Sequence, residues 1–231
     1  MVDLAKLRKR GEPVWLLVDG ENLASWFAER FSTRFMSSIR ALLVPDALGG
    51  DYAEFDAFVR HTIFTWRRLG VELQVAFDGP EPSGTSNNQM KDLTRQHRRR
   101  QKGDRRERVL KYMRTLQSDD LERLRNPSTT ILPPAFVEQV LASLRASGVE
   151  VRAAVGEADS LIAAEILRSS LLSRAPISKR GPKQFFAALT NDTDFMMYTG
   201  VRTVPLWAMP YPAPGAIRVL GIPRVLPALV A

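Results

Sequence analysis

Acidic side chains stand at or just after the ends of apolar runs at four points along this chain. The last point is the sequence ALTNDTDF at residues 188–195, in which Asp192 and Asp194 are two residues apart. Side chains at positions i and i+2 of a strand point to the same face, so both carboxylates are expected to enter one crevice at a strand's carboxyl end. Two such carboxylates repel each other unless a cation or a proton lies between them. Taken alone, the pair is better explained by an Asx turn that closes the strand.

Two of the other acidic points follow predicted strands directly. Asp19 comes after the continuous apolar run at residues 14–18, which is typical of a parallel strand buried on both faces. Asp78 comes after the alternating run at residues 71–77. Each residue also has a purely structural explanation, since Asp19 can cap the helix that follows it and Asp78 can form a tight turn with the next two residues, Gly and Pro.

The remaining acidic point lies at the start of a helix predicted from residue 156 to residue 166. Glu157 and Asp159 fall in its first turn, after a strand predicted at residues 149–155. Acids in a first turn complement the helix dipole, which is a structural explanation for them. The tightly packed apolar positions that follow leave these two side chains at the exposed start of the helix.

The elements that must position these acids alternate between strands and helices. Amphipathic helices are predicted at residues 51–69 and 136–144, and further strands at residues 184–189 and 201–207. This alternation predicts an α/β fold with a mostly parallel central sheet and helices on both faces. Six carboxylates then share one edge of the sheet: Asp19, Asp78, Glu157, Asp159, Asp192 and Asp194.

Composition restricts the chemistry that this edge can perform. The 231 residues carry a formal net charge of +8, which favours a polyanionic partner such as nucleic acid. Cysteine is absent and histidine occurs twice, which excludes thiolate zinc sites and disfavours a histidine-built centre. A metal here would be a hard, oxygen-liganded ion, Mg²⁺ or Mn²⁺. No apolar run is long enough to cross a bilayer, and we expect an intracellular protein, nuclear or cytoplasmic, with no membrane partner.

Residues 83–133 interrupt the alternation with a strongly basic segment. We interpret it as a helical arch or cap inserted in the domain, and phosphate contact as the reason for its charge, although a solvated helix face is the alternative. Lys91 and Arg98 are seven residues apart and would share one helical face. The basic residues that we expect to bind nucleic acid are Lys91, Arg95, Arg98, Arg99, Arg100, Lys102, Arg105 and Arg106.

A basic arch beside an acidic pocket is the combination that a metal-dependent nuclease needs. Two divalent ions about 4 Å apart can activate a water and stabilise the leaving oxygen of a phosphodiester. The residues therefore predict Mg²⁺- or Mn²⁺-dependent hydrolysis of DNA or RNA, with basic side chains holding the backbone.

Four blocks resemble the XPG/flap-endonuclease family of PIN-like 5′ nucleases, in that family's order. They are LVDGENL at residues 17–23, VAFDGP at 75–80, GEAD at 156–159 and TNDTDF at 190–195. The last block and the closing LPALVA are most similar to the Asteroid-type branch. The resemblance covers most of residues 14–231, is poorly defined from 83 to 150, and is expected to end before the family's helix-hairpin-helix part.

The resemblance implies a single PIN-like domain over residues 1–231, with the XPG amino-terminal and internal regions and the arch at 83–133. It implies that all six acids are catalytic ligands of two Mg²⁺ or Mn²⁺ ions. It also implies that Lys91 and Arg98 correspond to a phosphate-steering pair that assists catalysis, on flap or single-stranded substrates.

Two alternatives remain. One is a NYN-type ribonuclease, which the block at 75–80 and the basic insertion disfavour. The other is a catalytically silent PIN-like scaffold that binds RNA or protein partners. Retention of six acids argues against the silent scaffold, because an unused acidic cluster costs stability through repulsion.

Overall fold

The computed structural model describes residues 13–35, 52–80, 135–172 and 183–211, and the single residues 100, 104, 107 and 111. The chain divides into two compact units. The first comprises Met1–Phe27, Ala53–Glu81 and Val137–Ala231, and the second comprises Ala28–Tyr52 and Pro82–Phe136. Every strand that the structure describes belongs to the first unit.

A five-stranded sheet with the order β3-β2-β1-β4-β5 forms the centre of the first unit. All four strand pairings are parallel, which confirms the predicted sheet type. Central strand β1 is apolar on both sides because both of its faces are covered. The strands are β1 (Val14–Asp19), β2 (Val71–Phe77), β3 (Glu150–Ala153), β4 (Phe185–Leu189) and β5 (Thr203–Val204).

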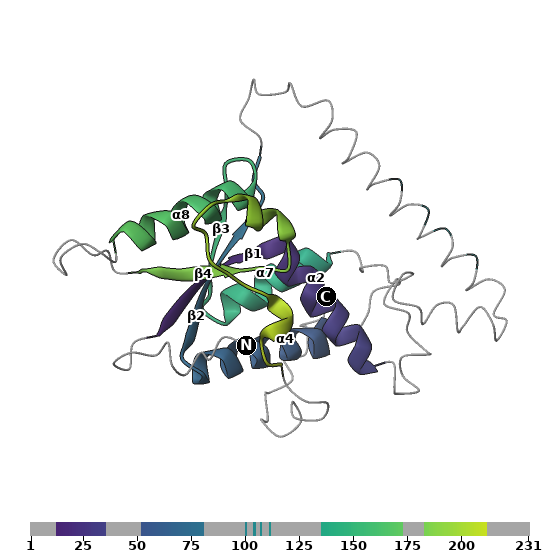
Figure 1. The fold of residues 1–231 in the computed structure, drawn as a ribbon. Helices are drawn as coiled ribbons and strands as arrows, with labels where there is room; N and C mark the ends of the chain where they lie inside the picture. Colours follow the sequence, from purple (N-terminus) through teal and green to yellow (C-terminus); the bar gives the residue numbers. More distant parts are fainter. Residues whose placement is uncertain are drawn as a thin grey trace. The chain divides into compact units, whose positions relative to one another are not determined.

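Helices cover both faces of this sheet, as predicted (Figure 1). Helix α8 lies on one face, and α4, α7 and the beginning of α2 lie on the other. The bounds are α2 (Gly20–Phe35), α4 (Tyr52–Arg68), α7 (Phe136–Ala146) and α8 (Ala158–Leu172), with short 3-10 helices η5 (Thr193–Met197) and η6 (Leu206–Ala208).

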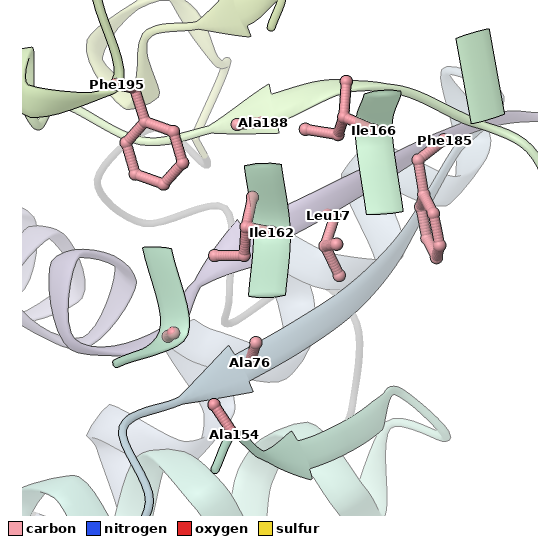
Figure 2. Close-up of a cluster of buried hydrophobic side chains, with 9 residues drawn as sticks. Leu17, Ala76, Ala154, Ile162, Ile166, Phe185, Ala188 and Phe195 are labelled. Carbon is pink, nitrogen blue, oxygen red and sulfur yellow. The ribbon is translucent and has the colours of Figure 1, made fainter. Parts of the chain in front are cut away.

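The α8 face is held by small and branched apolar side chains. Figure 2 shows Ile162 and Ile166 of α8 lying over Leu17 of β1 and Ala188 of β4. Alanines on the strands let the helix backbone approach the sheet closely, and Phe195 closes one end of the cluster. This packing fixes the position of the first turn of α8 relative to the strand ends.

Aromatic rings dominate the opposite face. Phe27 of α2 stacks on Trp66 of α4 with ring centroids 6.3 Å apart, and Trp26 lies 5.7 Å from the same ring. Helices α4 and α7 are joined by a 2.6 Å hydrogen bond from Ser143 Oγ to Asp56 Oδ1. Rings of this size bury large apolar areas, so they anchor α2 and α4 firmly to each other.

Element bounds differ from prediction at two places. Helix α8 begins at Ala158 and not at residue 156, so Asp159 lies in its first turn but Glu157 lies in the loop before it. The other difference comes after β4. The strand predicted at residues 201–207 is reduced to the two residues of β5, and η6 follows it after Pro205. Proline at that position lacks the N–H that a longer strand pairing would use.

Within the described ranges, none of the helices combines the length and apolar composition that a membrane crossing needs.

Candidate active site

The strand register brings the carboxyl ends of four strands to one edge. Asp19 of β1 pairs with Ala76 of β2, while Val18 pairs with Leu189 of β4. In the sheet, β2 and then β3 lie on one side of β1, and β4 and then β5 lie on its other side. The gap between β1 and β4 is therefore a topological switch point, which is where open α/β sheets bind ligands.

Asp19 ends β1 and lies at this switch point, with only 8% of its surface exposed. Its Oδ1 accepts hydrogen bonds from the backbone N–H groups of Glu21 and Asn22, both at 3.1 Å, so the predicted capping of α2 is present. Burial raises the pKa of Asp19, the bonds from Asn22 and Glu21 lower it, and the charge of Asp192 raises it further. The carboxylate is thus held firmly and lies within the field of a second one.

Asp78 connects the end of β2 to the start of α8. Its Oδ1 accepts a 2.9 Å hydrogen bond from the backbone N–H of Ala158, the first residue of that helix. Adjacent backbone bonds run from Gly79 N to Gly156 O at 2.9 Å and from Gly156 N to Pro80 O at 3.2 Å. These contacts bring the loop that carries Glu157 alongside the Asp78 loop.

Gly79 is required by this close approach. A Cβ atom built on it would lie 1.6 Å from the carbonyl oxygen of Ala154, far inside van der Waals contact. Gly156 is needed for a different reason, since its φ of +81° lies in the left-handed region that side chains disfavour. The two glycines let the turns after β2 and β3 lie against each other.

The pKa of Asp159 is raised by burial and by the negative charges of the other acidic residues. Its pKa is raised from 3.8 to about 6, first by burial and then by the charges of Asp19, Asp192, Asp78 and Glu157, in that order. The structure therefore brings five of the six predicted carboxylates into electrostatic contact at the carboxyl edge. Asp194 is not among the charges that raise the pKa of Asp19 or Asp159.

The pair Asp192 and Asp194 lies beyond β4 and not within it. Asp192 precedes η5, and its Oδ1 accepts a 2.9 Å hydrogen bond from the backbone N–H of Asp194. This is the Asx turn that was the structural alternative, and strand alternation does not set the direction of these side chains. Asp192 is half-buried and interacts with Asp19, whereas Asp194 is exposed.

Amide side chains that were not predicted as site residues connect the strand ends. The Asn22 side chain hydrogen-bonds the Asp19 carboxylate, and its Oδ1 accepts from the backbone N–H of Asn191 at 3.3 Å. The Asn191 Oδ1 in turn accepts from the backbone N–H of Trp207 at 3.3 Å. Asn22 lies three residues after the end of β1 and Asn191 two residues after the end of β4, both within the quoted blocks, and that proximity was the signal in the sequence.

The donor set fits Mg²⁺ or Mn²⁺ in its chemistry, because every group is a hard carboxylate oxygen. Within the part of the chain that the structure describes, no three Asp, Glu, His or Cys side chains are grouped closely enough to hold one ion. Asp19, Asp78 and Asp192 each turn one oxygen to the N–H groups of a different helix start. A carboxylate can accept such a bond and still bind a cation through its second oxygen.

Most of the predicted nucleic-acid contacts lie outside the described residues. These are Lys91, Arg95, Arg98, Arg99, Lys102, Arg105 and Arg106. Arg100 is described and is exposed on helical backbone, as the interpretation of this segment requires. The roles of this segment in binding and of Lys91 and Arg98 in catalysis therefore stay predictions.

The fold and the carboxyl edge together define an α/β protein with acidic side chains gathered at a topological switch point. No family model matches the chain, and no curated protein matches it. Two solved structures of the catalytic core of Rad2 in complex with DNA substrate, complexes III and II, align with 96% of this chain at 16% and 18% identity. Their TM-scores are 0.43 and 0.46, too low to define a function, and the chain spans about half of their length, 52% and 54%.

Proposed function

We propose that the carboxyl edge of the sheet is the active site of a nuclease that hydrolyses phosphodiester bonds and depends on Mg²⁺ or Mn²⁺. The observation that supports this proposal most strongly is that strand ends and the start of α8 bring five carboxylates to one edge, where burial first and then the charges of the other four raise the pKa of Asp159 to about 6. Such an arrangement is unfavourable without a cation, and perturbed groups at a switch point are typical of functional sites.

The proposed roles follow from how each side chain is held. Asp19, Asp78 and Asp192 are oriented by backbone N–H groups, so each would offer its remaining lone pairs to a cation at little entropic cost. Asp159 would be a ligand held in its ionised form by a bound cation, since a positive charge nearby lowers the pKa of a carboxylate. The bound ions would supply activation of water and stabilisation of the leaving oxygen.

We further propose that the chain is a PIN-like domain of the XPG type, close to the Asteroid branch, acting on DNA or RNA. Flap and single-stranded ends are the candidate substrates, and the basic residues of 83–133 would hold their phosphates. The four sequence blocks, the parallel sheet and the position of the acids support this family assignment.

A catalytically silent scaffold remains the second candidate. The observation in its favour is that Asp19, Asp78 and Asp192 all cap helix starts, which gives each of them a structural role without any metal. In that case the chain would bind RNA or protein partners without cleaving them.

Cleavage assays separate the two candidates. We expect the wild-type protein to cleave at least one of end-labelled 5′-flap DNA, single-stranded DNA and single-stranded RNA when Mg²⁺ or Mn²⁺ is added, and not in EDTA. The double substitution Asp192→Asn and Asp194→Asn should lower the rate by about 10²-fold or more, because it removes carboxylates that would hold the cations on which the hydrolysis depends.

Glu165→Gln is the matched control, because this acid lies on α8 and pairs with Arg168 at 4.0 Å, away from the strand ends. It should cleave like the wild type. Cleavage that survives in the double variant, or binding of all three substrates without cleavage, would contradict the nuclease proposal.

A further inference from the structure

Trp207 differs from the other tryptophans of the chain in its exposure. Trp26 and Trp66 are buried in the aromatic face, and Trp15 is half-buried with the Lys183 Nζ 4.7 Å from its ring centroid. Trp207, by contrast, exposes 68% of its surface. An exposed indole forgoes a large gain from burial, so it calls for an explanation.

The exposure of Trp207 is imposed by its neighbours. Leu206 before it and Met209 after it are both buried, and their burial anchors the η6 turn in the core of the first unit. The turn is closed by a bond from Ala208 N to Pro205 O at 3.0 Å. Just beyond, Trp66 Nε1 donates a 2.5 Å hydrogen bond to Pro210 O. The indole is thus presented outward from an anchored backbone.

The position of Trp207 is the carboxyl edge itself. Its backbone N–H donates to Asn191 Oδ1, and Asn191 directly precedes Asp192. Its turn follows β5, which pairs with β4 in parallel, so the turn leaves the sheet at the same edge as the acids. The η5 turn, which begins directly after Asp192, carries two further exposed apolar side chains, Met196 and Met197.

We propose that Trp207 is a stacking platform for a base of single-stranded nucleic acid bound along this edge. The inference rests on the proposed function, because the strand that stacks is the one whose phosphate the acidic site would act on. Stacking suits such a substrate, since every base has a π-face and no particular sequence is required. The net charge of +8 favours a polyanionic occupant. The exposed indole favours a polyanion that carries bases, which is nucleic acid, over an acidic protein surface.

Binding measured without cleavage tests the platform. Fluorescence anisotropy would compare a labelled 20-nucleotide oligo(dT) with an abasic oligomer of the same length and charge, both in EDTA. The wild type should bind oligo(dT) about tenfold more tightly, the scale of one good base–aromatic stack. Trp207→Ala should reduce that preference to about twofold or less, and Trp207→Phe should keep most of it.

Phe64→Ala is the matched control, because Phe64 is also an exposed ring, at 49%, but lies one turn before the end of α4, which leads into the amino end of β2. It should keep the full preference for bases. Circular dichroism should show native folding for all three variants, since the altered rings are largely exposed.

The outcomes separate this inference from the proposed nuclease. Equal binding of the two oligomers by the wild type, an unchanged preference in Trp207→Ala, or no binding at all would each overturn the platform. Base-dependent binding that is lost in Trp207→Ala supports it, whether or not the protein cleaves. Cleavage accompanied by an unchanged preference in Trp207→Ala would overturn the platform and leave the nuclease proposal standing.

Discussion

Asp159→Asn is expected to stabilise the metal-free protein at neutral pH and, at the same time, to lower cleavage about 10²-fold or more. The stabilisation follows because the substitution removes a partly buried charge that four carboxylates repel. Solvent screens a side chain that is only partly buried, and the lost interaction with the helix dipole opposes the gain. We therefore expect a net increase of about 1 kcal/mol or less in the free energy of unfolding, or roughly 2–4 °C in Tm.

The stabilisation by Asp159→Asn should depend on pH, because the pKa of Asp159 is raised in the folded state. The pKa of Asp159 is about 6 in the folded state, against the ordinary aspartate value of 3.8 expected in the unfolded state. Between these two pH values the native state therefore holds a proton that the unfolded state has released. The stability associated with protonated Asp159 is complete below 3.8 and is lost as pH rises through about 6. The difference in Tm between Asp159→Asn and wild type should therefore be smallest near pH 4 and largest above pH 6.

Thermal unfolding in EDTA between pH 4 and pH 8 measures this difference. Glu165→Gln, on the same helix but outside the acidic cluster, should show no such pH-dependent stabilisation. A Tm for Asp159→Asn that falls below wild type at pH 7.5 would mean that the carboxylates do not share a destabilising field.

Gly79→Ala is expected to give the largest loss of stability of any single substitution considered. Its Cβ would meet the backbone oxygen of Ala154 at 1.6 Å, and a backbone atom cannot turn aside as a flexible side chain can. The two turns would have to separate, breaking the Gly79 N to Gly156 O bond. We expect a loss of about 3 kcal/mol or more, measured by urea unfolding.

Gly156→Ala is the control within the same pair of turns. No atom lies within 4 Å of its added Cβ, so the cost there is only that of a positive φ, about 1 kcal/mol. If the two alanine variants lose the same stability, or if Gly79→Ala unfolds like the wild type, the close contact between the turns is wrong. Residual folded Gly79→Ala should also cleave poorly, because Asp78 would no longer bond Ala158 N.

The sheet was predictable from the sequence because parallel strands leave a strong pattern. Residues 14–18 are apolar on both faces, and the helices at α4 and α7 keep a clear amphipathic stripe. Since all strands run in parallel, an acid at each strand end had to fall on one edge. The arrival of Asp19, Asp78 and Asp192 at this edge follows from the parallel topology, and Glu157 and Asp159 are added by the loop and the helix start that follow β3.

The details around Asp192 and Asp194 were not predictable from strand alternation. The chain leaves β4 at Leu189 and tightens into η5, and a local Asx bond then sets the side-chain directions. The contacts of Asn22 with Asn191 and of Asn191 with Trp207 join residues far apart in sequence. Such contacts depend on the register of β1 against β4, which no local pattern specifies.

The central claim, that the acidic edge binds divalent cations, is tested most directly by titrating the protein with Mn²⁺ and following the free ion by electron paramagnetic resonance. We expect saturable uptake of about two ions by the wild type. Binding should be tighter at pH 7 than at pH 5 because protons compete, and excess Mg²⁺ should displace the ions. Asp19→Asn combined with Asp159→Asn should lose this uptake, since asparagine can keep the helix caps but not the charges. Absence of saturable uptake, or equal uptake by the wild type and the double variant, would contradict the account.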